Sequence, residues 1–128
     1  MTERAASPLI LAPELVLVLT TMPSRQSALA LARTLVTERL AACVNTLPGL
    51  ASTYVWQGEL TETEEVLCLI KTQRGRLGTF LPRLQQLHPY DVPEVLVIPV
   101  QAASEAYVTW ALAATGPRDH EAPSQSPR

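Results

Sequence analysis

The feature that most constrains the fold of this chain is a β-hairpin predicted between residues 42 and 72. Ala42 to Trp56 and Glu59 to Thr72 are both rich in strand-forming residues, and Gln57-Gly58 between them is typical of a tight turn that needs positive φ. Two arms of roughly 14 residues at about 3.3 Å per residue give a ribbon of about 45 Å, whereas a domain of this size has a radius of gyration of about 14 Å. The hairpin tip is therefore predicted to project beyond the domain.

The predicted tip is apolar and needs a partner to cover it. Tyr54, Trp56 and Leu60 lie near the turn, and a lone two-stranded ribbon is only marginally stable in water unless its apolar face is buried. Another copy of the same chain is the simplest partner. We therefore expect a homo-oligomer with Tyr54, Trp56 and Leu60 in the subunit interface.

The flanking segments predict one α+β domain over residues 14–115. The apolar run at 15–19 is typical of a central strand covered on both faces, and Ser24 is a candidate helix N-cap. Pro48-Gly49 favours a bulge in the first hairpin arm, and Pro82 interrupts the second helical pattern. In order, we expect a strand at 14–21, a helix at 24–39, the hairpin, a helix ending at His88, a strand at 94–100 and a helix at 104–114.

This order, β-α-β-β-α-β plus a C-terminal helix, predicts a ferredoxin-like sandwich when its crossovers are right-handed. The first two helices then cover one face of the sheet and leave the other face for a neighbour. Residues 1–13 are predicted to be a disordered leader. Residues 116–128 are predicted to be a disordered tail, because a segment rich in Pro, Ser and charge cannot bury enough apolar area to offset its ordering entropy.

Charge and composition restrict the partners. The net charge of −2 gives no basic footprint for nucleic acid and no polybasic segment for anionic lipid. The sequence has no apolar run of the roughly 18 residues that would span a bilayer, and its two cysteines lie in apolar surroundings that suit a reducing compartment. We expect a cytoplasmic protein. Because no known catalytic motif is present, we do not expect an enzyme.

His88 and Cys43 are the candidate metal ligands. His88 ends a predicted helix before Pro89, where its alternative role is to cap helical carbonyls, and Cys43 is either a thiolate ligand or a buried thiol. Closed sites generally use about three or four N or S donors, which one protomer can scarcely supply. Carboxylates or symmetry-related copies of His88 would have to complete such a site. The candidate carboxylates are Glu59, Glu64, Glu65, Asp91 and Glu94.

Lys71, Tyr90 and Glu94 are candidates for a ligand-binding cleft between subunits. Lys71 ends an apolar strand, where its ammonium either pairs with an acid such as Glu94 or binds an anionic ligand. Tyr90 lies in a segment stiffened by Pro89 and Pro93, which would position its hydroxyl. A structural hydrogen bond is the alternative role for that hydroxyl.

Three segments together resemble the CutA family of divalent-cation tolerance proteins. They are LVLTTMP at 17–23, ERLAACVNTLPG at 38–49 continued by STYVWQGEL at 52–60, and LIKT at 69–72 followed by HPYDVPE at 88–94. The resemblance covers about residues 14–110. It implies a ferredoxin-like protomer, a tight trimer formed by exchange of sheet edges, and an association with copper or another divalent metal.

The resemblance also implies a departure from the copper-binding bacterial pattern. Those members use a Cys at the position of Thr20 and a His at the position of Leu87. The leading expectation is a homotrimer in divalent-metal tolerance and homeostasis that binds metal weakly or between protomers. One alternative is a PII-like signalling trimer holding a small anionic or nucleotide ligand near Lys71, Arg74 and Arg76, and another is a trimer that scaffolds other proteins.

Overall fold

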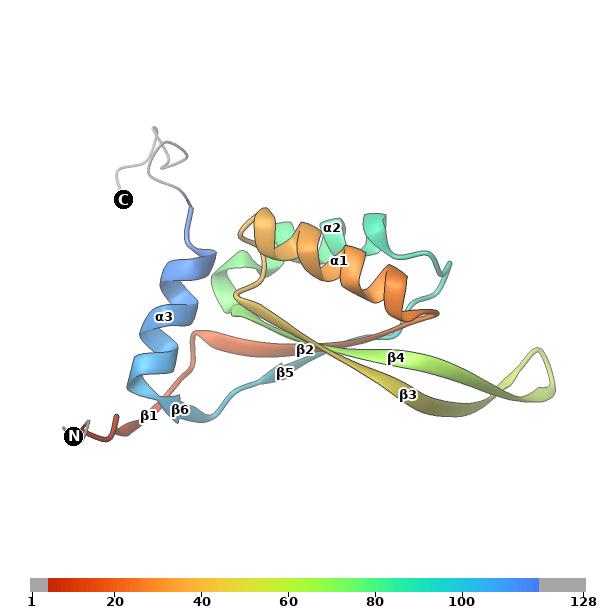
Figure 1. Cartoon of the computed structure of the whole chain (residues 1–128), viewed down its shortest axis with the longest axis horizontal. Coiled ribbons are helices and arrows are strands. Elements are labelled where there is room, and N and C mark those ends of the chain that lie inside the picture. The colour runs from red at the N-terminus through yellow and green to blue at the C-terminus, as the bar shows by residue number, and fades with distance from the viewer. Residues whose placement is uncertain (1–4, 118–128) are drawn as a thin grey trace.

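The computed structural model describes residues 5–117 as a four-stranded sheet with two helices on one face and a smaller two-stranded sheet beside a third helix (Figure 1). In chain order the elements are β1 (Leu9–Leu11), β2 (Leu15–Met22), α1 (Arg25–Thr37), β3 (Cys43–Trp56), β4 (Glu59–Gln73), a 3₁₀ turn (Arg74–Arg76), α2 (Leu77–Leu87), β5 (Val95–Pro99), β6 (Ala102–Ser104) and α3 (Glu105–Thr115). Among the described residues, no helix is long and apolar enough to cross a membrane.

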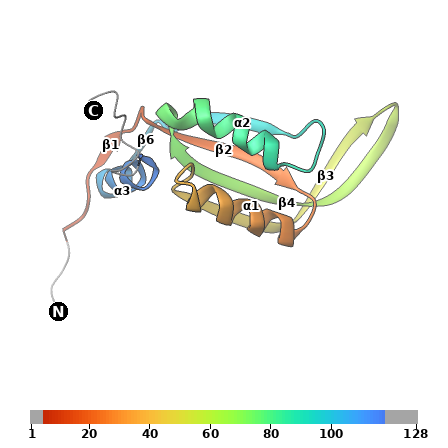
Figure 2. The same ribbon diagram turned by 90° about the horizontal axis from the view of Figure 1, so that it is seen from above.

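The main sheet has the strand order of a ferredoxin-like sandwich. Its strands lie in the order β3-β4-β2-β5 with antiparallel neighbours, and α1 and α2 cover the same face (Figure 2). The apolar run of β2 is paired with β4 on one side and β5 on the other, as its composition predicts. The predicted fold class is therefore confirmed.

The core lies between the sheet and the two helices. Val16 and Val18 of β2 pack with Leu35 of α1 and Phe80 of α2, and all four are fully buried. Because side chains alternate along a strand, the intervening residues of β2 point to the other face. Pro82 lies inside α2, where it removes one helical donor without ending the helix.

The other face of the sheet is apolar and uncovered in the protomer. Register and alternation place Leu17 and Leu19 of β2 there beside Leu96 and Ile98 of β5. Leu96 remains 50% exposed, and Ile98 is exposed as well. We call this surface the open face. The residues assigned to it by register are Leu17, Leu19, Asn45, Leu47, Leu67, Leu69, Lys71, Leu96, Ile98 and Cys43.

The hairpin forms as predicted and extends past the ends of α1 and α2 (Figure 1). Gln57 and Gly58 have φ of 52° and 82°, the left-handed pair that a two-residue hairpin turn requires. A register shift between Leu47 and Leu50 marks the expected bulge, with Gly49 at φ 84° inside it.

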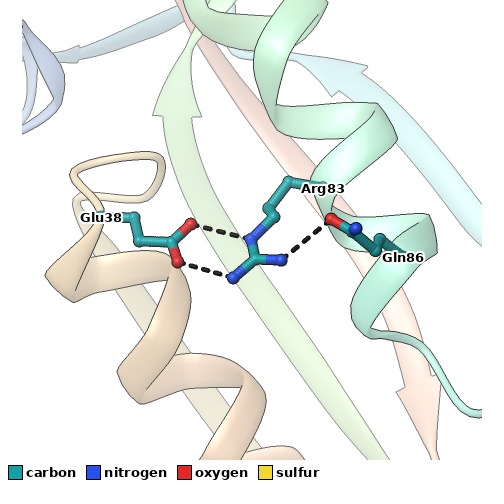
Figure 3. Close-up of polar contacts among 3 residues, drawn as sticks. All are labelled: Glu38, Arg83 and Gln86. Atoms are coloured by element: carbon teal, nitrogen blue, oxygen red, sulfur yellow. Dashed lines mark hydrogen bonds and ion pairs between the residues drawn. The ribbon is translucent and has the colours of Figure 1, made fainter.

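Two sets of hydrogen bonds stabilise the two ends of α1. Ser24 and Ser27 form a reciprocal capping box at the start of the helix. At the other end, Arg83 of α2 donates two hydrogen bonds to Glu38, of 2.9 Å and 2.7 Å, and a third of 2.9 Å to Gln86 (Figure 3). The hydrogen bond from Arg83 lowers the pKa of the Glu38 carboxyl.

The prediction of a disordered leader over residues 1–13 is wrong for its last part. Leu9–Leu11 pair with Ala102–Ser104, and Ala12 is fully buried in a second apolar cluster with Val108 of α3. The leader is ordered because it completes both a sheet edge and this cluster, which its short apolar run did not reveal. β6 was also not predicted. The predicted tail at 116–128 lies outside the described residues except for Gly116 and the residue after it.

Candidate functional site between the hairpin and the adjoining loop

A cleft of about 750 Å³ opens where the hairpin passes the loop that joins α2 to β5. Figure 2 shows the hairpin and this loop beyond the same end of β2. The cleft is lined by Thr21 from β2, by Ser52, Thr53, Tyr54, Trp56 and Glu65 from the hairpin, and by Pro89, Tyr90, Asp91, Val92 and Glu94 from the loop.

His88 lies behind the cleft with both ring nitrogens engaged. The side chain is only 7% exposed, and Nε2 lies 2.9 Å from the Thr21 carbonyl oxygen and 3.1 Å from Thr20 Oγ1. Since a carbonyl oxygen can only accept, Nε2 carries the proton, and Nδ1 accepts from the Tyr90 backbone N–H at 3.2 Å. Burial lowers the pKa of His88, opposed by its hydrogen bond to Thr21. The ring is therefore a neutral structural link between the loop and β2.

Tyr90 and Glu65 form the polar centre of the cleft wall. The Tyr90 hydroxyl donates a 2.7 Å hydrogen bond to Glu65 Oε2, and Glu65 is only 8% exposed. Burial, reinforced by the neighbouring Glu65 carboxylate, raises the pKa of Tyr90 far above its usual value. Tyr90 thus remains a hydrogen-bond donor at physiological pH, and its ring lies 5.0 Å from that of His88.

Of the three predicted ligand residues, Tyr90 and Glu94 line this cleft together, but Lys71 does not. Glu94 immediately precedes Val95, whose partner in β2 is Thr20, whereas Lys71 pairs with Leu17 on the opposite side of β2. Within the protomer Lys71 and Glu94 therefore form no ion pair, because the two residues lie at different levels of the sheet and two strands apart.

Lys71 instead belongs to the open face. Its ammonium donates to Asn45 Oδ1 and lies 4.0 Å from Cys43 Sγ. Arg74, predicted beside it as part of an anion site, donates to the Pro13 carbonyl oxygen at 3.0 Å. Both cations therefore make hydrogen bonds within the protomer.

The residues proposed as metal ligands are not brought together. Cys43 pairs with Lys71, whereas His88 contacts Thr20 at the far end of β2. Within residues 5–117, no group of three His, Cys, Asp or Glu side chains converges as a metal shell. One imidazole beside a hydroxyl and a carbonyl does not fit a closed copper or zinc site, which needs additional N or S donors.

The three predicted interface residues all remain accessible in the protomer. Trp56 is 54% exposed, Leu60 is 74% exposed and Tyr54 is 42% exposed. The contacts of Thr20 and Thr21 with His88 were not predicted. Two threonines at the end of an apolar strand carry no signal for a hydrogen bond to a histidine far along the chain. Glu65 was anticipated only as one of several carboxylates.

Comparison with known proteins places these features in one family. The family model for CutA1 divalent ion tolerance protein matches residues 16–114. The divalent-cation tolerance protein CutA of Thermus thermophilus is 46% identical over 99 residues, covering 77% of this chain and 96% of that protein. Its name, like that of the family, describes a tolerance protein and not an enzyme.

Solved structures give the same result. CutA from Synechococcus elongatus PCC7942 has a TM-score of 0.83 at 37% identity, covering 86% of this chain and 97% of that chain. CutA from Xylella fastidiosa has a TM-score of 0.78 at 41% identity, covering 80% and 99%. From its sequence, its ferredoxin-like fold and these relatives, the chain belongs to the CutA1 family of divalent ion tolerance proteins.

Proposed function

We propose that this protein acts as a homotrimer in divalent-metal tolerance, with copper as its leading metal, and that any metal is bound weakly or at sites shared between protomers. The observation that carries the proposal is the open face, a mainly apolar and partly exposed surface on a protein whose relatives are divalent-cation tolerance proteins. Exposed apolar surfaces of this kind mark protein interfaces.

The hairpin supports the same assembly. Its tip carries Tyr54, Trp56 and Leu60, all accessible in the protomer, on a ribbon that extends past the helices. Burial of aromatic anchors against a second copy would stabilise a ribbon that is otherwise marginal. Trimerisation would thus bury the apolar residues of both the open face and the hairpin.

The positions of the proposed ligands favour a metal site between protomers over one within a protomer. A single protomer offers no convergent group within the described residues. Cys43 lies on the open face, where copies of the chain would approach one another, whereas His88 would have to give up its hydrogen bond to Thr21. Cys43 is therefore the better placed of the two proposed ligands, and its thiolate suits a soft ion such as copper(I).

A copper(I) titration in ascorbate with bicinchoninate as competing ligand tests this proposal. We expect saturable binding by the trimer that is lost in Cys43→Ala and retained in Cys68→Ala, because Cys68 is fully buried in the core under the helices. His88→Ala reports the contribution of the second proposed ligand. Light scattering on the same samples gives the oligomeric state. Absence of binding by the parent, or equal binding by the parent and Cys43→Ala, would contradict the metal assignment, and a monomer would contradict the trimer.

The alternative with an anionic or nucleotide ligand has less support. Among residues 5–117, the lining of the cleft between hairpin and loop includes Glu65, Asp91 and Glu94 and no Lys or Arg. A negatively charged ligand would be repelled from such a lining.

A further inference from the structure

The cleft between the hairpin and the loop that joins α2 to β5 has the size of a small-molecule site. Its volume of about 750 Å³ lies within the usual range of roughly 300–1,000 Å³ for ligand pockets. The lining combines aromatic rings with a few polar groups, as such pockets do. The chemistry of those groups indicates which class of ligand the space suits.

Glu65 is the most buried carboxylate of the cleft wall. Its side chain is more than nine-tenths buried, and among the described residues its only hydrogen bond comes from the uncharged Tyr90 hydroxyl, onto Oε2. The other carboxylate oxygen, Oε1, has no donor in the described part of the chain but is not fully buried, so it can accept from a ligand in the cleft that Glu65 lines. Asp91 and Glu94 add carboxylates of the same sign to the wall, and no Lys or Arg among residues 5–117 lines it.

The cation that these acids suit is larger than a metal ion. Bound metals need oxygen donors that converge to about 2.0–2.6 Å, and the described residues hold no convergent group of three such side chains. Instead, the carboxylates share the lining with Tyr54, Trp56 and Tyr90. Aromatic faces attract ammonium groups through the ring quadrupole, and cages of this composition recognise alkylated ammonium ions.

We propose that this cleft binds a small organic cation, a protonated amine or quaternary ammonium compound. Its charge lies against Glu65, and its apolar groups lie against Trp56 and Tyr90. This site is separate from any metal site at Cys43, which lies on the open face at the other end of β2. The hairpin that supplies Trp56 is also expected to contact a neighbouring subunit, so the site is tested in the intact assembly.

Calorimetric titration with choline tests the proposal, beside dimethylbutanol, the uncharged isostere in which carbon replaces the ammonium nitrogen. We expect choline to bind with micromolar to millimolar affinity and the neutral isostere to bind at least about tenfold more weakly. Citrate, an anion of similar size, is expected not to bind. Quenching or a shift of Trp56 fluorescence, measured in a Trp110→Phe background, gives a second readout of occupancy.

Two matched variants locate the site. Glu65→Gln keeps an acceptor for the Tyr90 hydroxyl but removes the charge, and should weaken choline binding at least about tenfold. Glu64→Gln makes the same change on the adjacent residue, which is exposed and does not line the cleft, and should leave binding unchanged. If Glu65→Gln does not fold, Trp56→Leu and Asp91→Asn take its place, each with the expectation of weaker binding.

Several outcomes overturn the proposal. They are no binding of choline by the folded parent, equal binding of choline and dimethylbutanol, and an affinity for choline that is the same in the parent and in all folded cleft variants. Because copper binding and oligomeric state are measured separately, failure here is distinguishable from failure of the proposed metal function.

Discussion

At the scale of single residues, the contact between Thr20 and His88 decides what this site can do. Thr20 is the position at which the family resemblance implies a cysteine in metal-binding members, and the fold brings its Oγ1 within 3.1 Å of Nε2 of His88. Here the neighbour is a hydroxyl, and the imidazole also donates to the Thr21 carbonyl. The same geometry therefore serves a structural hydrogen bond instead of a thiolate and imidazole pair.

The depressed pKa of His88 predicts a pH dependence of stability. Burial favours the neutral ring, so the folded pKa lies below the ordinary value of 6.5, and the unfolded state binds more protons between the two values. The contribution of the neutral His88 ring to the free energy of unfolding is fully present above about pH 6.5. This contribution is lost as the pH falls from there through the folded pKa. We expect the free energy of unfolding, measured by urea denaturation from pH 8 to pH 5, to decline below about pH 6.5.

The variant His88→Gln isolates this contribution. An amide can retain a hydrogen bond to Thr21 but does not titrate in this range, so the decline below pH 6.5 should become shallower than in the parent. A variant with the same pH profile as the parent would show that His88 is not the responsible group.

The hydrogen bond between Tyr90 and Glu65 gives a second prediction at this scale. Tyr90→Phe leaves a nearly buried carboxylate without its donor and should destabilise the fold by about 1–3 kcal/mol in denaturant titrations. Tyr107→Phe is the control, because no hydrogen bond joins the Tyr107 hydroxyl to another described residue, although its ring packs 5.5 Å from Trp110. Equal losses in the two variants would contradict the assigned role of the Tyr90 hydroxyl.

At the scale of elements, the segment before β2 determines how α3 is held. The first amide groups of α3 are bonded by this segment, since Glu105 N–H donates to the Pro8 carbonyl oxygen at 2.8 Å and Ala106 N–H donates to Ser7 Oγ at 2.9 Å. Ser104 Oγ accepts from Tyr107 N–H and completes the cap. This segment thus supplies both the strand β1 beside β6 and, through Ser7 and Pro8, part of the cap of a helix about one hundred positions later in the chain. It lies outside the residues that match the family model.

Deletion of residues 2–11 should therefore loosen α3 selectively. The truncated protein loses β1, two hydrogen-bond acceptors for the first amides of α3 and the Ile10 contact with the second apolar cluster. We expect amide hydrogen exchange in α3 and β6 to accelerate by roughly one to two orders of magnitude, corresponding to about 1–3 kcal/mol of local stability. Exchange in α1 serves as the internal control, because its capping box and its contacts with α2 lie elsewhere. Uniform acceleration across the chain would contradict a local role.

At the scale of the whole molecule, the open face and the hairpin together explain why one protomer is incomplete. Both first helices cover the same side of the sheet, so the apolar residues of the other side remain half-exposed or exposed. Most monomeric proteins do not expose a continuous apolar surface of this kind. The protomer is therefore suited to association through this face.

A charge on the open face should disrupt the proposed trimer. Ile98→Asp places a carboxylate among Leu17, Leu19 and Leu96 neighbours, where burial would cost several kcal/mol, and light scattering should show dissociation to smaller species. Val36→Asp is the matched control, since Val36 is an exposed apolar residue of α1 on the opposite side of the sheet. A trimer that persists in Ile98→Asp would contradict the assignment of this face to the interface.

Local patterns determined much of this architecture from the sequence alone. Strand alternation, the Gln57-Gly58 turn, the bulge at Pro48-Gly49 and the serine caps act over a few residues, so composition and spacing were enough to predict the order of the main elements. The family resemblance also followed from short segments. Pairing of Leu9–Leu11 with β6 could not be predicted, because a three-residue strand is stabilised by a partner far along the chain.

The functional site also combines features that the sequence predicts with contacts that only the folded structure creates. The sequence by itself determined the ferredoxin-like fold, the overhanging hairpin and the residues of the loop from His88 to Glu94. Only the tertiary structure decided that His88 bonds to Thr21, that Lys71 lies on the open face away from Glu94, and that Glu65 meets Tyr90 in an aromatic cleft. The physical reason is that hydrogen bonds and charge pairs act over a few ångströms, so they depend on which distant segments the folded sheet brings into contact.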